Sequence, residues 1–223
     1  PYHASKVYIS RLLRLGKKIV ICEQVGDPKA KGLTERKVVE TITPGTAVES
    51  EYLEGNSNNY LAALCVFRGK TGFAFIDVTT SSFCATSWNA SDMAEQFPKE
   101  LGRCSPKEML LPQSLKNNGT VQSALEEYPG MSVSYYPDWD FNAELGYKKL
   151  CAQFKTASLQ PFGLTETSCE VPAAGFLLDY LEKTAEKFPE KTAFADVTES
   201  ITWKELVESS KKLSTVIEKY FLR

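Results

Sequence analysis

Apolar residues recur at intervals of three and four in several stretches of the chain, the spacing of a helix that buries one face. In the first stretch Tyr8, Leu12 and Leu15 share a stripe and Gly16 supplies a stop, so a helix is predicted there. Shorter apolar runs bounded by turn residues indicate strands. The predicted helices are residues 4–15, 91–101, 121–127, 142–154, 170–188 and 203–220. The predicted strands are residues 18–22, 36–43, 61–67, 73–78, 83–86, 109–111, 131–135 and 192–196.

The order of these elements indicates two units separated by the polar segment Gly55–Asn59. Residues 1–46 are expected to form a partial mixed α/β sheet. Residues 58–184 begin with a hairpin and then alternate helix and strand, which predicts an α/β fold with a complete mixed sheet. Ser105 to Glu108 fits a capping box, which predicts one helical turn before the next strand. The side chains expected to be largely buried are Phe75, Ile76, Leu110, Trp139, Phe154 and Phe162.

Composition is that of a globular protein, with 43% hydrophobic and 24% charged residues among 223. It excludes disordered, collagen-like and coiled-coil classes, and no apolar run reaches the ~18 residues of a membrane span. Charge is uneven, because residues 1–43 hold nine Lys and Arg against four acidic residues. Arg11, Arg14 and Lys18 share one helix face, which is either a solvated face or a phosphate-contacting one. The chain opens on Pro1 instead of Met, so we expect a piece of a longer protein.

The residues that carry chemistry are few. Six cysteines show no Cys-x-x-Cys pair, and His3 is the only histidine, which argues against a zinc site. Cys22 and Cys65 lie in apolar runs and are expected in the core of a reduced, cytoplasmic protein. Asp77 is an isolated carboxylate. A metal-dependent nuclease would need a second one on a neighbouring strand, and the runs EMLLP and VSYYP look apolar. A strand-end carboxylate is the better interpretation, and no glycine-rich phosphate loop is present.

Several strings resemble the MutS family of DNA mismatch repair proteins. The strings PYHA, YISRLLRLGKKIVICEQVGDP and ERKVVETITPGT resemble the second half of its mismatch-recognition domain. Farther on, GFAFIDVTTSSF, PKEMLLP and AAGFLLDYLEKT resemble its connector domain, which has an RNase H-like fold without nuclease activity. The resemblance covers residues 1–184 and implies a recognition-domain part at 1–54 and a connector at 58–184.

What the resemblance implies for function is binding of mismatched double-stranded DNA and signalling to MutL through the connector. The family's Phe-x-Glu wedge and ATPase domain fall outside the matching residues. The chain is therefore expected to be no enzyme and to hold no cofactor, although the full-length family uses ATP and magnesium and forms homodimers. The resemblance places Pro1, Tyr2, His3 and Arg36 near the DNA backbone, in phosphate-positioning roles. It also implies a cytoplasmic location without membrane contact.

The tail, residues 185–223, resembles a different family. Its string KFPEKTAFADVTESITWKELVE is similar to the start of adenylate-forming (AMP-binding) enzymes, and Thr202 with Glu205 fits the capping-box pattern that predicts the start of a helix. A chimeric reading frame is the first explanation, and a genuine fusion is the second. The alternative function is the N-terminal piece of an adenylate-forming ligase with an unrelated extension. Coverage discriminates the two, since the first resemblance spans 184 residues and the second only the tail.

Overall fold

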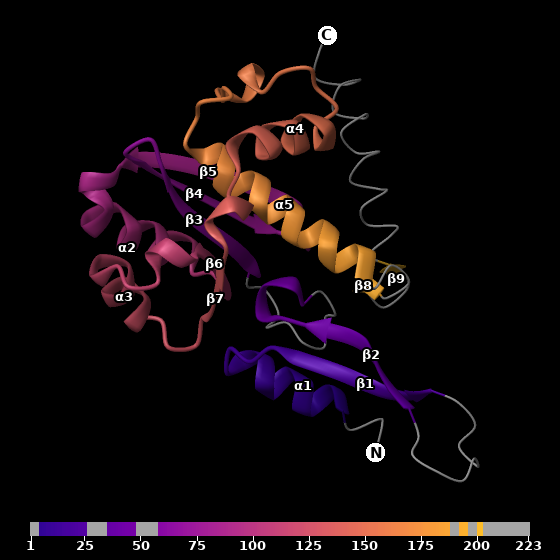
Figure 1. The fold of residues 1–223 in the computed structure, drawn as a ribbon. Coiled ribbons are helices and arrows are strands. Elements are labelled where there is room, and N and C mark those ends of the chain that lie inside the picture. Colours follow the sequence, from indigo (N-terminus) through magenta and orange to yellow (C-terminus); the bar gives the residue numbers. More distant parts are fainter. Residues whose placement is uncertain (1–4, 26–34, 48–57, 188–191, 196–199, 203–223) are drawn as a thin grey trace.

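The computed structural model describes residues 5–25, 35–47, 58–187, 192–195 and 200–202, and within them the strands form three separate sheets (Figure 1). Residues 5–25 and 35–47 form a small α/β unit, here called the N-terminal unit, and residues 58–187 form a larger body. A short ribbon follows the body. No helix in these ranges is long and apolar enough to cross a membrane.

The N-terminal unit comprises three main elements and a turn. They are α1 (Ser5–Arg14), β1 (Ile19–Val25), β2 (Glu35–Ile42) and the 3-10 turn η2 (Pro44–Thr46). The two strands are antiparallel, with Ile19 opposite Ile42, and their register shifts between Ile21 and Cys22. Helix α1 covers one side of this ribbon with Ile9 and Leu13, and the core they share is small.

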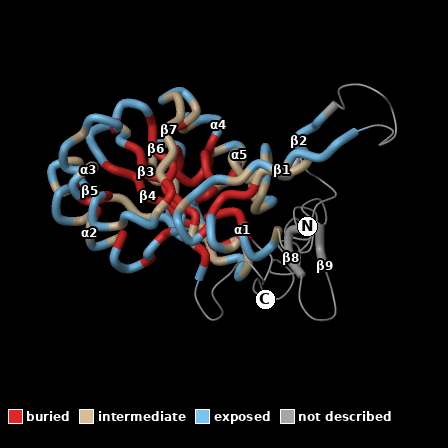
Figure 2. Tube along the Cα trace, turned by 90° about the horizontal axis from the view of Figure 1, so that it is seen from below, coloured by how far each residue is buried: buried red, intermediate tan, exposed pale blue. Residues whose placement is uncertain are grey.

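The buried face of α1 is not the expected one. Ile9 and Leu13 are buried, whereas Tyr8 and Leu15 are 61% and 65% exposed. The sequence offers two apolar stripes at helical spacing, and the ribbon selects the stripe that can reach Ile42. Cys22 on β1 was also expected in the core, but it is exposed, as is most of that strand (Figure 2). Only one side of this ribbon is covered, which explains the exposure.

The body is built on one five-stranded sheet. Its strands are β3 (Tyr60–Phe67), β4 (Lys70–Asp77), β5 (Ser82–Asn89), β6 (Glu108–Pro112) and β7 (Ser132–Tyr136), in the order β5-β4-β3-β6-β7. The hairpin strands pair antiparallel, and β6 and β7 join β3 in parallel. The predicted mixed sheet is therefore confirmed.

Two pairs of helices cover this sheet, one pair on each face (Figure 1). They are α2 (Met93–Cys104) and α3 (Gly119–Glu126) on one face, and α4 (Ala143–Gln153) and α5 (Glu170–Lys187) on the other. The alternation along β4 divides its side chains between the two faces. Phe73 and Phe75 face α2 and α3, while Ala74 and Ile76 face α4 and α5.

Helices α4 and α5 cross with their backbones in close approach. A Cβ atom built on Gly175 would lie 2.3 Å from the Cα of Gly146. A Cβ atom on Gly146 would in turn lie 2.8 Å from the carbonyl oxygen of Val171. Helix α5 contacts β3 and β4 of the sheet, and α4 packs against α5.

Two of the aromatic residues expected in the core are exposed. Trp139 is 77% exposed in the 3-10 turn η5 (Asp138–Asp140), because Phe141 two residues later fills the core and packs 4.3 Å from the ring of Phe176. Phe162 is 56% exposed, although one side of its ring contacts Phe154. The other four expectations are met in different degrees. Phe75 and Leu110 are buried, and Ile76 and Phe154 are partly buried.

Two local predictions need correction. No helical turn forms at Ser105–Lys107. Ser105 ends α2 in a left-handed conformation, and the chain then extends so that the Lys107 amide donates to the Tyr60 carbonyl. The helix predicted to begin at residue 91 begins at Met93, because Ser91 lies in a 3-10 turn, η3 (Ala90–Asp92), that precedes it. In the tail, β8 (Thr192–Ala195) pairs with β9 (Ser200–Thr202), and the helix predicted at 203–220 lies outside the described residues.

Candidate functional site

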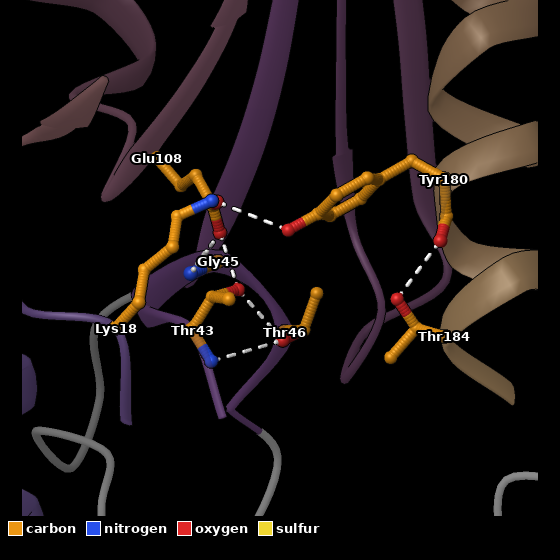
Figure 3. Close-up of polar contacts among 7 residues, drawn as sticks. All are labelled: Lys18, Thr43, Gly45, Thr46, Glu108, Tyr180 and Thr184. Carbon is orange, nitrogen blue, oxygen red and sulfur yellow. Dashed lines mark hydrogen bonds and ion pairs between the residues drawn. The ribbon is translucent and has the colours of Figure 1, made fainter. Parts of the chain in front are cut away.

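A buried carboxylate joins the N-terminal unit to the body. Glu108 is the first residue of β6 and is fully buried. Its Oε1 atom accepts from Lys18 Nζ at 2.9 Å and from the Tyr180 hydroxyl at 3.2 Å. Its Oε2 atom accepts from the Thr43 hydroxyl at 2.5 Å and from the Gly45 amide at 3.2 Å (Figure 3). All four acceptor positions of the carboxylate are therefore used.

Three of these four donors belong to the N-terminal unit. Lys18 precedes β1, and Thr43 and Gly45 belong to the turn after β2. Thr46 supports Thr43, since their hydroxyl oxygens are 2.7 Å apart and the Thr43 amide donates to Thr46. The fourth donor, Tyr180, comes from α5 of the body. Burial, together with the negative charge of Glu108, raises the pKa of Tyr180 above its usual range, so its hydroxyl remains a donor.

Asp77 is the second fully buried carboxylate, at the end of β4. Its Oδ2 accepts from the Asn59 amide at 3.0 Å. Its Oδ1 accepts from the amide and the hydroxyl of Thr79 at 2.9 and 2.6 Å. Asn59 also donates its side-chain amide to the Ala47 carbonyl at 2.8 Å. Asp77 therefore fixes a strand end, as the sequence suggested, and it holds Asn59 against the N-terminal unit.

The two carboxylates do not form a metal centre together. The expectation that β6 offers no carboxylate was wrong, because Glu108 opens that strand. However, Asp77 shares a sheet face with Phe73 and Phe75, while Glu108 shares the opposite face with Leu110. Two-metal chemistry needs carboxylates that converge on one point. Among the residues with a described position, no group of three or more His, Cys, Asp or Glu could hold a metal ion.

The residues proposed to contact DNA are only partly visible. Pro1, Tyr2 and His3 lie outside the described residues. Arg36 is exposed on β2, paired across the ribbon with Gln24. Arg11 and Arg14 are exposed on α1, and Lys18, which lies beyond the end of this helix, is also exposed although its Nζ pairs with Glu108. Of these exposed cations, Lys18 is the one that contributes to the junction with the body.

Glu108 is the functional residue that sequence reasoning missed. Its Ser-x-x-Glu context was interpreted as a helix cap, and the strand behind it looked wholly apolar. The signal that could have found it is a single acidic residue at the start of a buried parallel strand, where an unpaired charge is strongly disfavoured. Such a residue predicts donors from elsewhere in the chain.

Comparison with known proteins gives consistent matches. The family model described as MutS domain I matches residues 1–51, and the model described as MutS domain II matches residues 59–195. The DNA mismatch repair protein MutS of Treponema denticola is 53% identical over 194 residues, which cover 82% of this chain and 22% of that protein. The MutS proteins of Symbiobacterium thermophilum and Desulfatibacillum aliphaticivorans are 40% and 37% identical over 184 residues. These cover 82% of this chain and 21% and 20% of theirs.

The chain thus spans about a fifth of the length of the curated relatives it matches. Among solved structures, Thermus thermophilus RuvC in complex with a Holliday junction substrate shares 15% identity, with a TM-score of 0.38. The match covers 59% of this chain and 94% of the RuvC chain. That likeness is too weak to support an argument about the fold.

Proposed function

This chain belongs to the MutS family of DNA mismatch repair proteins, and from that premise we propose that its N-terminal unit contacts the backbone of duplex DNA while its body serves as the connector. The body corresponds to domain II and would carry signals to MutL. We propose an RNase H-like fold for it, without nuclease activity. The observation that carries the proposal is the match of residues 1–51 to domain I, in a unit whose cations are exposed.

The geometry supports phosphate contact better than base reading. Arg36 and Arg11 stand on the surface of a small unit that carries most of its positive charge outside the junction. Cations on a ribbon and a helix can neutralise phosphates without entering a groove, which gives affinity with little sequence preference. We propose the same phosphate-positioning role for Pro1, Tyr2 and His3. Binding is therefore expected to be weak and indifferent to mismatches.

Other roles in the family lie beyond these residues. We propose that the chain itself is no enzyme and holds no cofactor, and that ATP, magnesium and homodimer formation belong to other parts of the longer relatives. We also propose a cytoplasmic location, where mismatched DNA would be met. We propose that the tail, residues 185–223, has another origin, as its resemblance to adenylate-forming enzymes implies. The domain II match runs to residue 195, into this tail.

The test is a titration of three fluorescent duplexes, one matched, one with a G·T mismatch and one with a single-base loop, at several salt concentrations. We expect weak binding of equal strength to all three. Arg36→Ala should weaken each equally and reduce the slope of log K against log salt by about one.

Lys99→Ala is the matched control, since Lys99 is a surface cation of α2 that pairs with Glu95 in the body. Its removal takes away one positive charge but should leave the affinity for DNA unchanged. Tight, mismatch-selective binding would overturn the backbone-contact proposal. Equal losses for Arg36→Ala and Lys99→Ala would overturn the specific role of Arg36.

A further inference from the structure

We propose that the N-terminal unit is held on the body by a docking site centred on Glu108, and that this docking does not depend on the chain connecting the two. The N-terminal unit here means residues 5–25 and 35–47, and the body means residues 58–187. This inference concerns how the two domains are joined and stands independently of DNA binding.

The first argument is the direction of the hydrogen bonds. Glu108 belongs to the body, but three of its four donors, Lys18, Thr43 and Gly45, belong to the N-terminal unit. A carboxylate with no exposed surface is strongly disfavoured unless its acceptor positions are filled. Undocking would exchange these three protein donors for water and leave Tyr180 as the one protein donor. The donors of the N-terminal unit therefore match the acceptor positions of this carboxylate.

The second argument is the fit of backbone at the same place. A Cβ atom on Gly45 would lie 2.9 Å from both the Glu108 Cβ and the Leu61 Cδ1. Gly16 follows α1 with φ +69°, and a Cβ atom there would lie 2.8 Å from the Gly130 carbonyl oxygen. Both glycines let the unit approach the body more closely than any side chain would allow. The contact is thus complementary in shape as well as in charge.

The third argument concerns the connection itself. Ala47 and Asn59 lie at the two ends of the intervening segment, and their hydrogen bond of 2.8 Å holds those ends together. Asp77 also holds Asn59 in place, because its carboxylate accepts from the backbone amide of Asn59. The chain leaves and returns at one point, so residues 48–58 are not needed to set the position of the unit. Lengthening or cutting that segment should leave the docked arrangement intact.

The experiment introduces a protease recognition sequence between residues 50 and 55 of the full chain and cuts it. Size-exclusion chromatography then reports whether the two pieces stay together. We expect co-elution at about 10 μM, corresponding to a dissociation constant in the micromolar range or below. Glu108→Gln should weaken the association at least tenfold. Each carboxylate oxygen of Glu108 accepts from two donors, so the NH₂ group of the substituted glutamine would meet two donors instead of acceptors in either orientation.

A second variant keeps the body unchanged. Gly45→Ala puts a methyl group against Glu108 and Leu61 and should also weaken association at least tenfold, even if Glu108→Gln fails to fold. Glu170→Gln is the control, because Glu170 accepts from Ser87 within the body and should leave the association unchanged. Separation of the wild-type pieces at 10 μM would overturn the proposal of linker-independent docking. Equal association of wild type and both variants would overturn the role of Glu108.

Discussion

Replacing Gly175 by alanine tests the close helix crossing that shapes one face of the body. Alanine is the best helix former, and in an exposed helix interior it is more stable than glycine by about 1 kcal/mol. At Gly175 the added Cβ would lie 2.3 Å from the Cα of Gly146, where ordinary contact begins near 3.4 Å. The obstacle is backbone, so α4 and α5 would have to separate by about 1 Å to restore contact.

Overpacking of this kind typically costs about 1–3 kcal/mol and exceeds the gain in helix propensity. We therefore expect Gly175→Ala to lower the free energy of unfolding by about 1–2 kcal/mol, or Tm by about 2–8 °C. Urea titrations followed by circular dichroism measure the first, and thermal scans measure the second.

Gly102→Ala provides the matched comparison. Gly102 lies inside α2, and a Cβ there would meet only the Tyr128 hydroxyl at 3.6 Å, an ordinary contact. This variant should be more stable than wild type by about 0.5–1 kcal/mol. The two substitutions have the same chemistry in two helices, and their effects should have opposite signs. Equal stabilisation by both would refute the backbone contact between α4 and α5.

Three other predictions concern the thiols and the tail. Burial raises the pKa of Cys65 to about 12 and that of Cys104 to about 12. At pH 8 a thiol reagent should therefore label the exposed Cys22 and Cys84 first, which peptide mapping would show. Early labelling of Cys65 would contradict its burial. The pKa of these thiols is about 9 in the unfolded chain, so the unfolded chain loses their protons first as the pH rises. The stability contributed by Cys65 and Cys104 should therefore be present below pH 9 and fall between about pH 9 and 12, as denaturant titrations would measure. Truncation after Thr184 should leave the chain at least as soluble and no less stable, since within the described part of the chain β8 and β9 pair with each other in a sheet separate from that of the body. A large loss of stability would mean that the tail is an integrated part of the fold.

The body could be predicted because its signals are local. Alternation along β4 assigns Phe73 and Phe75 to one face whatever the rest of the chain does, since side chains of a strand alternate. The caps of α4 are local too, and Asn142 accepts from the Leu145 amide as the predicted start requires. The order of hairpin, helix and strand then leaves few ways to build one sheet.

The N-terminal unit resisted prediction because its local signal is ambiguous. Helix α1 carries two apolar stripes, one with Ile9 and Leu13 and the other with Tyr8, Leu12 and Leu15. Periodicity alone satisfies both. Contact with Ile42 decides between them, and that residue lies more than twenty-five positions away in the sequence. The same limit applied to Trp139 and Phe141, where two aromatic residues competed for one place beside Phe176.

Glu108 shows why the junction could not be derived from spacing. Its donors Lys18, Thr43, Gly45 and Tyr180 are distant in sequence, and each is unremarkable in its own segment. The need for these donors can be inferred only from Glu108 itself, because a buried carboxylate needs hydrogen-bond donors and the body supplies one of the four. The N-terminal unit has a small core of its own, built from Ile9, Leu13, Ile42 and Ala47. The contact with Glu108 therefore adds to a small apolar core, and we expect a change at that carboxylate to affect the N-terminal unit as well as the body.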